Sequence, residues 1–198
     1  MKIGLTGGIA CGKSTVCDYL RQQGYFIADA DAISHSLTAP GGAALPAIRA
    51  AFGDSVFDGN VLNRRALGSI VFSSEEKREL LNGILHPMII ARVTEELEAH
   101  DAPDTLVFGD VPLLYECAMA HMFDNVWVIS VPREVQIDRI CLRDGLARPE
   151  AERRIDAQMP LERKRALADH VIDSDGPMEA TRAQVRDLIR SIHSRRNA

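Results

Sequence analysis

The sequence predicts an α/β fold of three layers, in which helices cover both faces of a parallel sheet. Two observations carry this prediction. Short apolar runs alternate with helical patterns along the 198 residues, and such alternation is typical of parallel sheets with helical crossovers. A glycine-rich turn also joins the first apolar run to the first helical pattern, as in strand–loop–helix phosphate sites.

The first elements are short and sharply bounded. Residues 2–6 are an apolar run closed by glycines and are predicted to form a buried parallel strand. Residues 13–23 follow a helical pattern, which Gly24 ends. Residues 25–28 are predicted to form the second strand.

The middle of the chain has a different organisation. Between residues 33 and 100 the pattern is mostly helical, without a convincing core strand, and Pro40-Gly41-Gly42 interrupts it. The segment is long for a crossover, because one helix suffices to join two parallel strands. We therefore predict a helical insertion over about 43–100 in a core formed by about 1–32 and 103–198.

The second half returns to alternation. Strands are predicted at 105–109, 126–131 and 170–173, and helices at 133–144 and from 178 to about 193. These elements complete the predicted parallel sheet.

Composition excludes several classes of protein. The formal net charge is −5, so bulk electrostatics does not favour nucleic acid as a partner. No apolar run is long enough to span a bilayer and no secretory signal follows Met1, so we expect a cytoplasmic protein without a membrane partner. The four cysteines lack metal-binding spacing and are expected to be reduced thiols.

Residues 7–14 match the phosphate-loop pattern G-x-x-x-x-G-K-[ST] in full. Glycines at both ends let the backbone curl, so that amide N–H groups surround phosphate oxygens at a helix N-terminus. The lysine reaches the β- and γ-phosphates of ATP, and the serine hydroxyl is placed to bind Mg²⁺. The predicted nucleotide-binding residues are Gly7, Gly8, Ala10, Cys11, Gly12, Lys13, Ser14 and Thr15.

One cysteine lies inside this loop. Because backbone amides lower the pKa of a nearby thiol, we expect Cys11 to be reactive.

The class of phosphate-loop protein can be narrowed. A GTPase should carry the guanine-reading Asn-Lys-x-Asp, but none of the four lysines follows an asparagine. A mechanical ATPase or transporter subunit is usually larger. A small-molecule kinase remains, and it needs a carboxylate near the acceptor hydroxyl, cations for the transferring phosphoryl group and an acceptor pocket.

Three carboxylates follow predicted strands. Asp29 and Asp31 lie at the end of the second strand, an edge that faces the ligand in open parallel sheets. These carboxylates suit accepting a proton or binding Mg²⁺ through water. They suit capping the N-terminus of a helix equally well. Asp110 follows the third strand and carries the same two interpretations, which placement alone does not decide.

The cations are concentrated in one stretch. Residues 133–165 hold eight arginines and seven acids, so much of this stretch is predicted to be a salt-bridged surface. Arg139 and Arg143, one turn apart, share a helix face and could close over phosphates as a lid. His86 has no role from the residues alone, and Pro87 suits the first turn of a following helix.

Beyond these patterns, ordered segments along nearly the whole chain resemble one family. They are TGGIACGKST at 6–15, Asp29-Ala30-Asp31, LNRRAL at 62–67, LHP at 85–87, DVPLLYE at 110–116, Gln136 with Arg139 and Arg143, Arg154-Ile155 with Gln158, and Ala168-Asp169 before Val171-Ile172. In this combination the sequence resembles dephospho-CoA kinase, a family with the P-loop NTPase fold. Departures are Ala10-Cys11, where many members have Gly-Ser, and Ser174, where an asparagine is frequent.

The resemblance implies transfer of the γ-phosphoryl group of ATP to the ribose 3′-hydroxyl of dephospho-CoA, giving CoA. It implies a nucleotide core, a helical substrate domain and a lid at about 139–160. The implied catalytic residues are Asp31, Lys13, Arg139 and Arg143, with Asp29, Arg64, Arg65 and His86 on the acceptor side and Ser14 and Asp110 toward Mg²⁺. The alternatives are a nucleoside or nucleoside-monophosphate kinase and an ATP-binding regulatory protein without chemistry.

Overall fold

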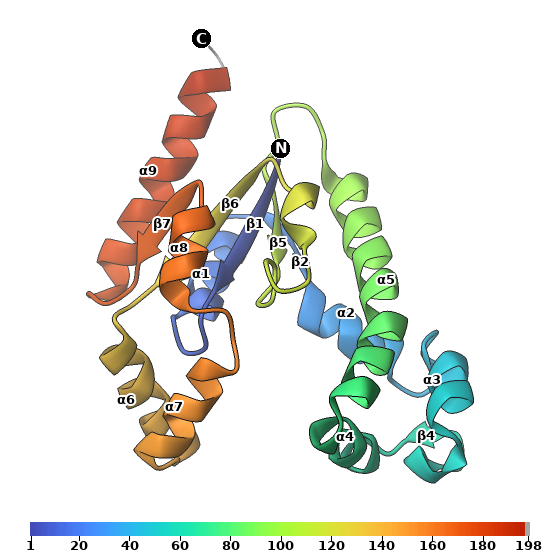
Figure 1. Ribbon diagram of the computed structural model, residues 1–198. Coiled ribbons are helices and arrows are strands. Elements are labelled where there is room, and N and C mark those ends of the chain that lie inside the picture. Colours follow the sequence, from blue (N-terminus) through green and yellow to red (C-terminus); the bar gives the residue numbers. More distant parts are fainter. Residues whose placement is uncertain (197–198) are drawn as a thin grey trace. The chain divides into compact units, whose positions relative to one another are not determined.

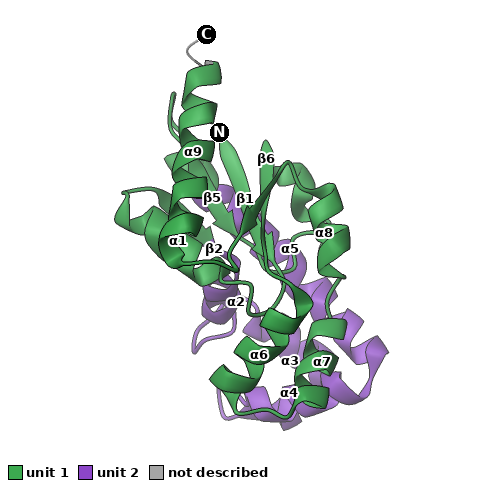
Figure 2. Ribbon diagram, turned by 90° about the vertical axis from the view of Figure 1, so that its left-hand side faces the viewer, with its two compact units in different colours: residues 1–28, 97–198 green, residues 29–96 purple. Residues whose placement is uncertain are grey.

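The computed structural model describes residues 1–196, which divide into two compact units (Figures 1 and 2). Unit 1 consists of Met1–Ala28 and the chain from Leu97 onward. Unit 2 consists of Asp29–Glu96. Within the described residues, no helix combines the length and the apolar character needed to cross a membrane.

Unit 1 is built on a sheet with the order β2-β5-β1-β6-β7. The strands are β1 (Lys2–Gly7), β2 (Phe26–Asp29), β5 (Val107–Asp110), β6 (Asn125–Ser130) and β7 (His170–Asp173). β1 pairs in parallel with β5 and β6, and β6 pairs in parallel with β7. The predicted central parallel sheet is therefore confirmed. Because parallel strands end at the same edge, the segments after β1 and β5 emerge side by side.

Helices cover both faces of this sheet, as the alternation predicted. Helices α1 (Lys13–Gln22) and α9 (Met178–Arg196) lie on one face, and α8 (Leu161–Leu167) lies on the other (Figure 2). The core between sheet, α1 and α9 contains fully buried apolar side chains such as Leu5, Leu20 and Val185. Helices α6 (Arg133–Asp144) and α7 (Arg148–Asp156) pack together through a smaller cluster around Ile140 and Ala151.

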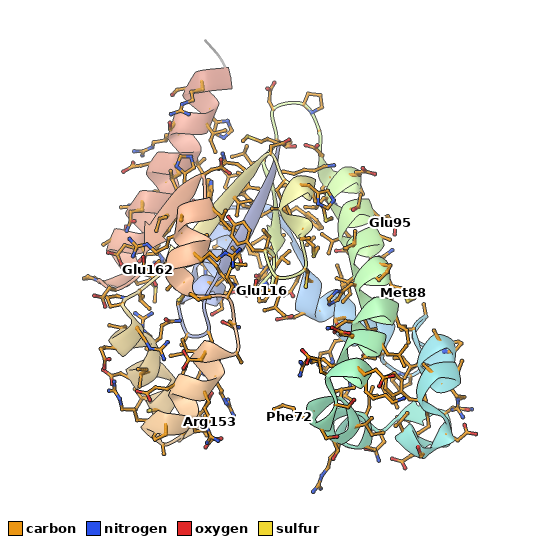
Figure 3. The ribbon with its side chains drawn as sticks, viewed as in Figure 1. Phe72, Met88, Glu95, Glu116, Arg153 and Glu162 are labelled. Atoms are coloured by element: carbon orange, nitrogen blue, oxygen red, sulfur yellow. The ribbon has the colours of Figure 1, made fainter. Side chains whose placement is uncertain are left out.

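Unit 2 is mainly helical and has its own core. Its elements are α2 (Ala30–Leu37), α3 (Leu45–Phe52), the 3₁₀ turn η1 (Asp54–Val56), β3 (Phe57–Asp58), β4 (Val61–Leu62), α4 (Arg64–Ser73) and most of α5 (Glu75–His100). Buried Ile48, Val56 and Leu67 form the centre of its core. The two-residue strands β3 and β4 pair antiparallel; they were not predicted, because so short a hairpin leaves no periodic pattern. Phe72, at the end of α4, is 93% exposed and is labelled in Figure 3.

One expectation in this region is wrong. Pro87 does not open a helix but lies inside α5. Apolar residues on both sides of it, Leu85 and Met88, pack against the core of unit 2. This packing supports a continuous helix even though proline lacks the N–H for one helical hydrogen bond.

Candidate active site

The phosphate loop leaves β1 at Gly7 and enters α1 at Lys13. Gly12 caps α1 with a left-handed φ of 81° and has no side chain to occupy the first-turn amides. Those N–H groups therefore face out of the helix end, where an anion can accept from them. Ala10 also has a positive φ, of 61°. The backbone thus curls twice within three residues, as a turn that wraps a phosphate requires.

Gly7 is needed for a different reason. A Cβ atom at this position would lie 2.6 Å from the carbonyl oxygen of Ile129, its partner on β6. That contact is against backbone and cannot be relieved by a side-chain rotation. Close strand approach therefore explains the first glycine of the motif, and left-handed backbone explains Gly12.

Two glutamines fix the apex of the loop. Gln136 of α6 donates from Nε2 to the carbonyl oxygen of Ile9 at 2.8 Å. The amide of Ile9 in turn donates to Oε1 of Gln158, which follows α7, also at 2.8 Å. The position of the loop is therefore coupled to α6 and to the segment after α7.

Ser174 and Arg139 hold the second half of the loop. The Ser174 hydroxyl donates to the carbonyl oxygen of Cys11 at 2.5 Å. The Arg139 guanidinium donates to the carbonyl oxygens of Ala10 at 3.3 Å and of Ser174 at 2.7 Å. Ser174, a departure noted in the sequence, thus supports the shape of the loop through its hydroxyl.

Lys13 and Asp110 form an ion pair at the mouth of the loop. Asp110 ends β5 and is only 7% exposed. Its second oxygen accepts a hydrogen bond from the Cys17 thiol at 3.3 Å. Burial raises the pKa of Cys17 above its ordinary value, and the negative charge of Asp110 raises it further. The thiol therefore remains protonated and orients the carboxylate.

The oxygen atoms near Lys13 have the right chemistry for Mg²⁺. Ser14 lies in the first turn of α1, and Asp110 ends β5, the strand paired with β1. The Ser14 hydroxyl and the Asp110 carboxylate are hard oxygen donors of the type that this ion prefers. Among residues 1–196 no group of three or more His, Cys, Asp or Glu side chains forms a metal cage. This donor set fits an ion that also takes ligands from water and substrate phosphates.

A cavity of about 420 Å³ opens beside the loop. Its volume falls in the range of small-molecule and cofactor sites. Arg139 and Arg143 bring two guanidinium groups to it, and Leu142 and Met178 bring apolar side chains that are 89% and 52% exposed. The remaining lining residues are Ala10, Gly12, Ser14, Thr15, Ser174, Gly176 and Thr181.

The two arginines have different partners. Arg139 bonds to backbone carbonyls of the loop and of Ser174. Arg143 forms a bidentate ion pair with Asp144, which raises the pKa of the Arg143 guanidinium above its ordinary value. Arg143 is exposed and held only at the surface, so its guanidinium is free to turn toward a bound anion at little cost.

The expectation that Cys11 is reactive is contradicted. The Cys11 side chain is buried, with 1% of the residue exposed. Burial raises the pKa of this thiol, and this effect exceeds the lowering by the backbone of Gly8 and by the charge of Arg139. Sequence reasoning counted the amides of the loop but missed the desolvation, which depends on the packing around the sulfur.

The predicted acceptor-side carboxylates belong to unit 2. Asp29 is the N-cap of α2, and its Oδ1 accepts from the amide of Ala32 at 2.9 Å. The capping interpretation therefore holds for Asp29. Asp31 lies in the first turn of α2 and is exposed. A carboxylate in this position is favoured by the helix dipole.

Arg64 is connected to the same helix. Its guanidinium donates to the Thr38 hydroxyl at 2.7 Å, just beyond the end of α2. Asp31 and Thr38 are seven residues apart and thus share a helix face, two turns from one another. Arg65, next in α4, is exposed, and His86 lies in the middle of α5 and is half-buried.

Sequence reasoning missed one buried charge in unit 1. Lys164 of α8 is completely buried and pairs with Glu116 at 2.8 Å. It stands between two arginines in Arg163-Lys164-Arg165, a run that looks like an ordinary charged surface. The only available signal was the helical period, which turns Lys164 inward with Leu161 and away from its neighbours.

Comparison with known proteins agrees with this geometry. The family described as CoaE, dephospho-CoA kinase, matches residues 1–180. The dephospho-CoA kinase of Shouchella clausii (strain KSM-K16) is 44% identical over 191 residues, covering 96% of this chain and 97% of the relative.

Solved structures agree as well. Dephospho-CoA kinase from Campylobacter jejuni superposes with a TM-score of 0.75 and 29% identity, covering 98% of both chains. Shikimate kinase from Aquifex aeolicus has a TM-score of 0.52 at 20% identity, covering 95% of this chain and 96% of that one, and shares the fold alone. Because the family model matches residues 1–180, the chain belongs to the dephospho-CoA kinase family.

Proposed function

We propose that this chain transfers the γ-phosphoryl group of ATP to the 3′-hydroxyl of the ribose of dephospho-CoA, giving CoA and ADP. This reaction is the last step of coenzyme A biosynthesis. The observation that carries the proposal is a complete phosphate loop, with Lys13 and an uncapped helix end, in a chain of this kinase family. Kinases of this family use ATP as the phosphoryl donor. We expect the reaction in the cytoplasm.

The loop binds the phosphates of ATP. The first-turn amides of α1 donate to phosphate oxygens, and Lys13 leaves Asp110 to approach the β- and γ-phosphates. The ion pair with Asp110 keeps the lysine charge compensated before ATP arrives. Mg²⁺, held by Ser14 and Asp110, would offset charge on the phosphates.

Arg139 and Arg143 are proposed to act on the phosphates from α6. Both arginines line the cavity together with loop residues, which supports a role in stabilising negative charge on the transferring group. The segment of about 139–160 is proposed to act as the lid, which excludes water while the phosphoryl group moves.

Unit 2 is proposed to supply the acceptor side. Asp31 accepts the proton of the 3′-hydroxyl while the ribose 3′-oxygen forms a bond to the γ-phosphorus. The bond between the γ-phosphorus and the bridging oxygen of the β-phosphate then breaks and releases ADP. Asp29 supports this arrangement by capping the helix that carries Asp31. Arg64, Arg65 and His86 are proposed to bind dephospho-CoA.

The test is a panel of acceptors. The purified chain is incubated with ATP and Mg²⁺ and with dephospho-CoA, adenosine, AMP or shikimate, and products are separated by chromatography with mass detection. We expect turnover of dephospho-CoA alone, and loss of turnover when EDTA removes the metal. Turnover of adenosine or AMP instead would indicate a nucleoside or nucleoside-monophosphate kinase. ATP binding without transfer to any acceptor would indicate a regulatory protein.

A further inference from the structure

The buried pair of Lys164 and Glu116 has a place in unit 1 that the proposed reaction does not yet use. The Lys164 ammonium has three acceptors: the carbonyl oxygens of Gly7 at 3.3 Å and Pro112 at 3.0 Å, and Oε1 of Glu116 at 2.8 Å. An ammonium has three donors, so every N–H has a partner. Full pairing explains how a lysine with no exposed side-chain surface is tolerated.

The two carbonyl groups belong to the segments that carry the phosphate site. Gly7 is the first residue of the phosphate loop, and Pro112 lies two residues beyond Asp110. The Pro112 carbonyl oxygen also accepts from the hydroxyl of Thr6 at 3.0 Å. A single ammonium therefore links the end of β1 to the segment that follows β5.

Glu116 extends this link to a third segment. Its Oε1 also accepts from the amide of Met159 at 3.0 Å, and Met159 lies between α7 and α8. Figure 3 shows Glu116 on the loop that follows β5, below the sheet. The segment that ends the proposed lid is therefore held to the same ion pair that holds the phosphate loop.

Stability alone is a weak reason for such a pair. Apolar residues of similar volume usually support a fold as well as a buried ion pair or better, because two charges must be desolvated. What apolar residues cannot do is donate to carbonyl oxygens of two different segments at once. The value of Lys164 therefore lies in the relative position of those segments.

We propose that Lys164 is a positioning residue for phosphoryl transfer. Its ammonium fixes the Gly7 carbonyl against the Asp110 segment, and through Glu116 it fixes the segment after α7. This inference rests on the proposed function. It assigns Lys164 no contact with ATP or with the acceptor.

The experiment separates positioning from stability. Lys164→Met removes the ammonium and leaves Glu116 unpaired, whereas Lys164→Met with Glu116→Gln also removes the lone carboxylate and still lets residue 116 accept from Met159. The matched control is Arg165→Met, one residue further in α8, where the side chain is exposed and pairs with Glu162 at the surface. For each protein kcat, the KM for dephospho-CoA and the melting temperature are measured, with kinetics well below the melting temperature.

We expect Lys164→Met to have a lower melting temperature than the parent. The double variant should regain part of that decrease in melting temperature. Both should lower kcat by about 10²-fold, the usual effect of a displacement of about 1 Å in a reacting arrangement. The KM for dephospho-CoA should stay within about threefold, because the acceptor site is not altered. The control should resemble the parent in all three quantities.

Two results would overturn the inference. One is a double variant, or a folded Lys164→Met, with the kcat of the parent. The other is a double variant in which kcat recovers in proportion to the melting temperature. That result would make the Lys164–Glu116 pair purely structural. If Lys164→Met does not fold, the double variant alone decides.

A measurement that needs no substrate tests the role of Lys164 separately from the proposed function. Amide hydrogen exchange of residues 7–12, followed by mass spectrometry, should be faster in the double variant than in the control. A parent protein that does not phosphorylate dephospho-CoA would refute the proposed function. Unchanged exchange in the double variant would refute the role of Lys164.

Discussion

Replacing Gly7 by alanine tests the link between strand packing and the phosphate site. The new methyl group would lie 2.6 Å from the carbonyl oxygen of Ile129, about 0.8 Å inside the 3.4 Å at which ordinary contact begins. The oxygen belongs to the backbone of β6, and the backbone of residue 7 in β1 fixes the position of the methyl group, so β1 or the start of the loop has to move. Such overpacking costs about 1–3 kcal/mol of unfolding free energy.

The displacement reaches the phosphate site at once, because Gly7 is the first residue of the loop. A shift of this size should lower kcat by about 10- to 100-fold. Unfolding free energy is measured by urea titration, and kcat is measured from CoA formation. Gly68→Ala is the control, since a Cβ atom there meets nothing within 4 Å. Because alanine favours a helix more than glycine does, this change should raise the free energy of unfolding by about 1 kcal/mol. A Gly7→Ala protein with the stability and kcat of the parent would refute the reasoning.

The remaining predictions concern single side chains. Asp31→Asn should lower kcat by about 10²–10⁴-fold with little change in ATP affinity by calorimetry, and near-normal turnover would remove Asp31 from the role of base. Lys13→Ala should weaken ATP binding and lower kcat together; a loss in only one of them would contradict the assigned role. Iodoacetamide at pH 8 should modify the half-buried Cys141 before the buried Cys11, as read by peptide mass spectrometry, and early labelling of Cys11 would refute its burial. Because burial raises the pKa of Cys17 above its ordinary 9.0, its contribution to stability is present below pH 9 and is lost as the pH rises further. Urea titrations at pH 8 and pH 10 should show a loss of about 1 kcal/mol from this thiol that Cys17→Ser does not show, and equal losses in both proteins would contradict it.

The sequence predicted those features that local patterns determine. The strand at 170–173 and the helix at 133–144 have the predicted bounds, because each is a periodic segment between clear breaks. The phosphate loop was predicted as well, since its function depends on backbone shape and on glycines at fixed spacing.

Features that depend on desolvation and on distant partners were not predicted. The reactivity of Cys11 was judged wrongly because the packing around its sulfur comes from other elements. Lys164 was missed because its acceptors, at Gly7, Pro112 and Glu116, are far away in sequence. The close approach of β6 to Gly7 is likewise a property of strand pairing.

The most direct measurement follows the phosphoryl group itself. The purified chain is given Mg²⁺, dephospho-CoA and ATP whose γ-phosphate carries a heavy oxygen isotope, which shifts its signal in phosphorus NMR. The product is examined by that method. The proposed function predicts that the label forms a monoester coupled to the 3′ proton of the ribose, in a yield equal to the ADP formed. Label recovered only as inorganic phosphate, or bound to any other hydroxyl, would contradict it.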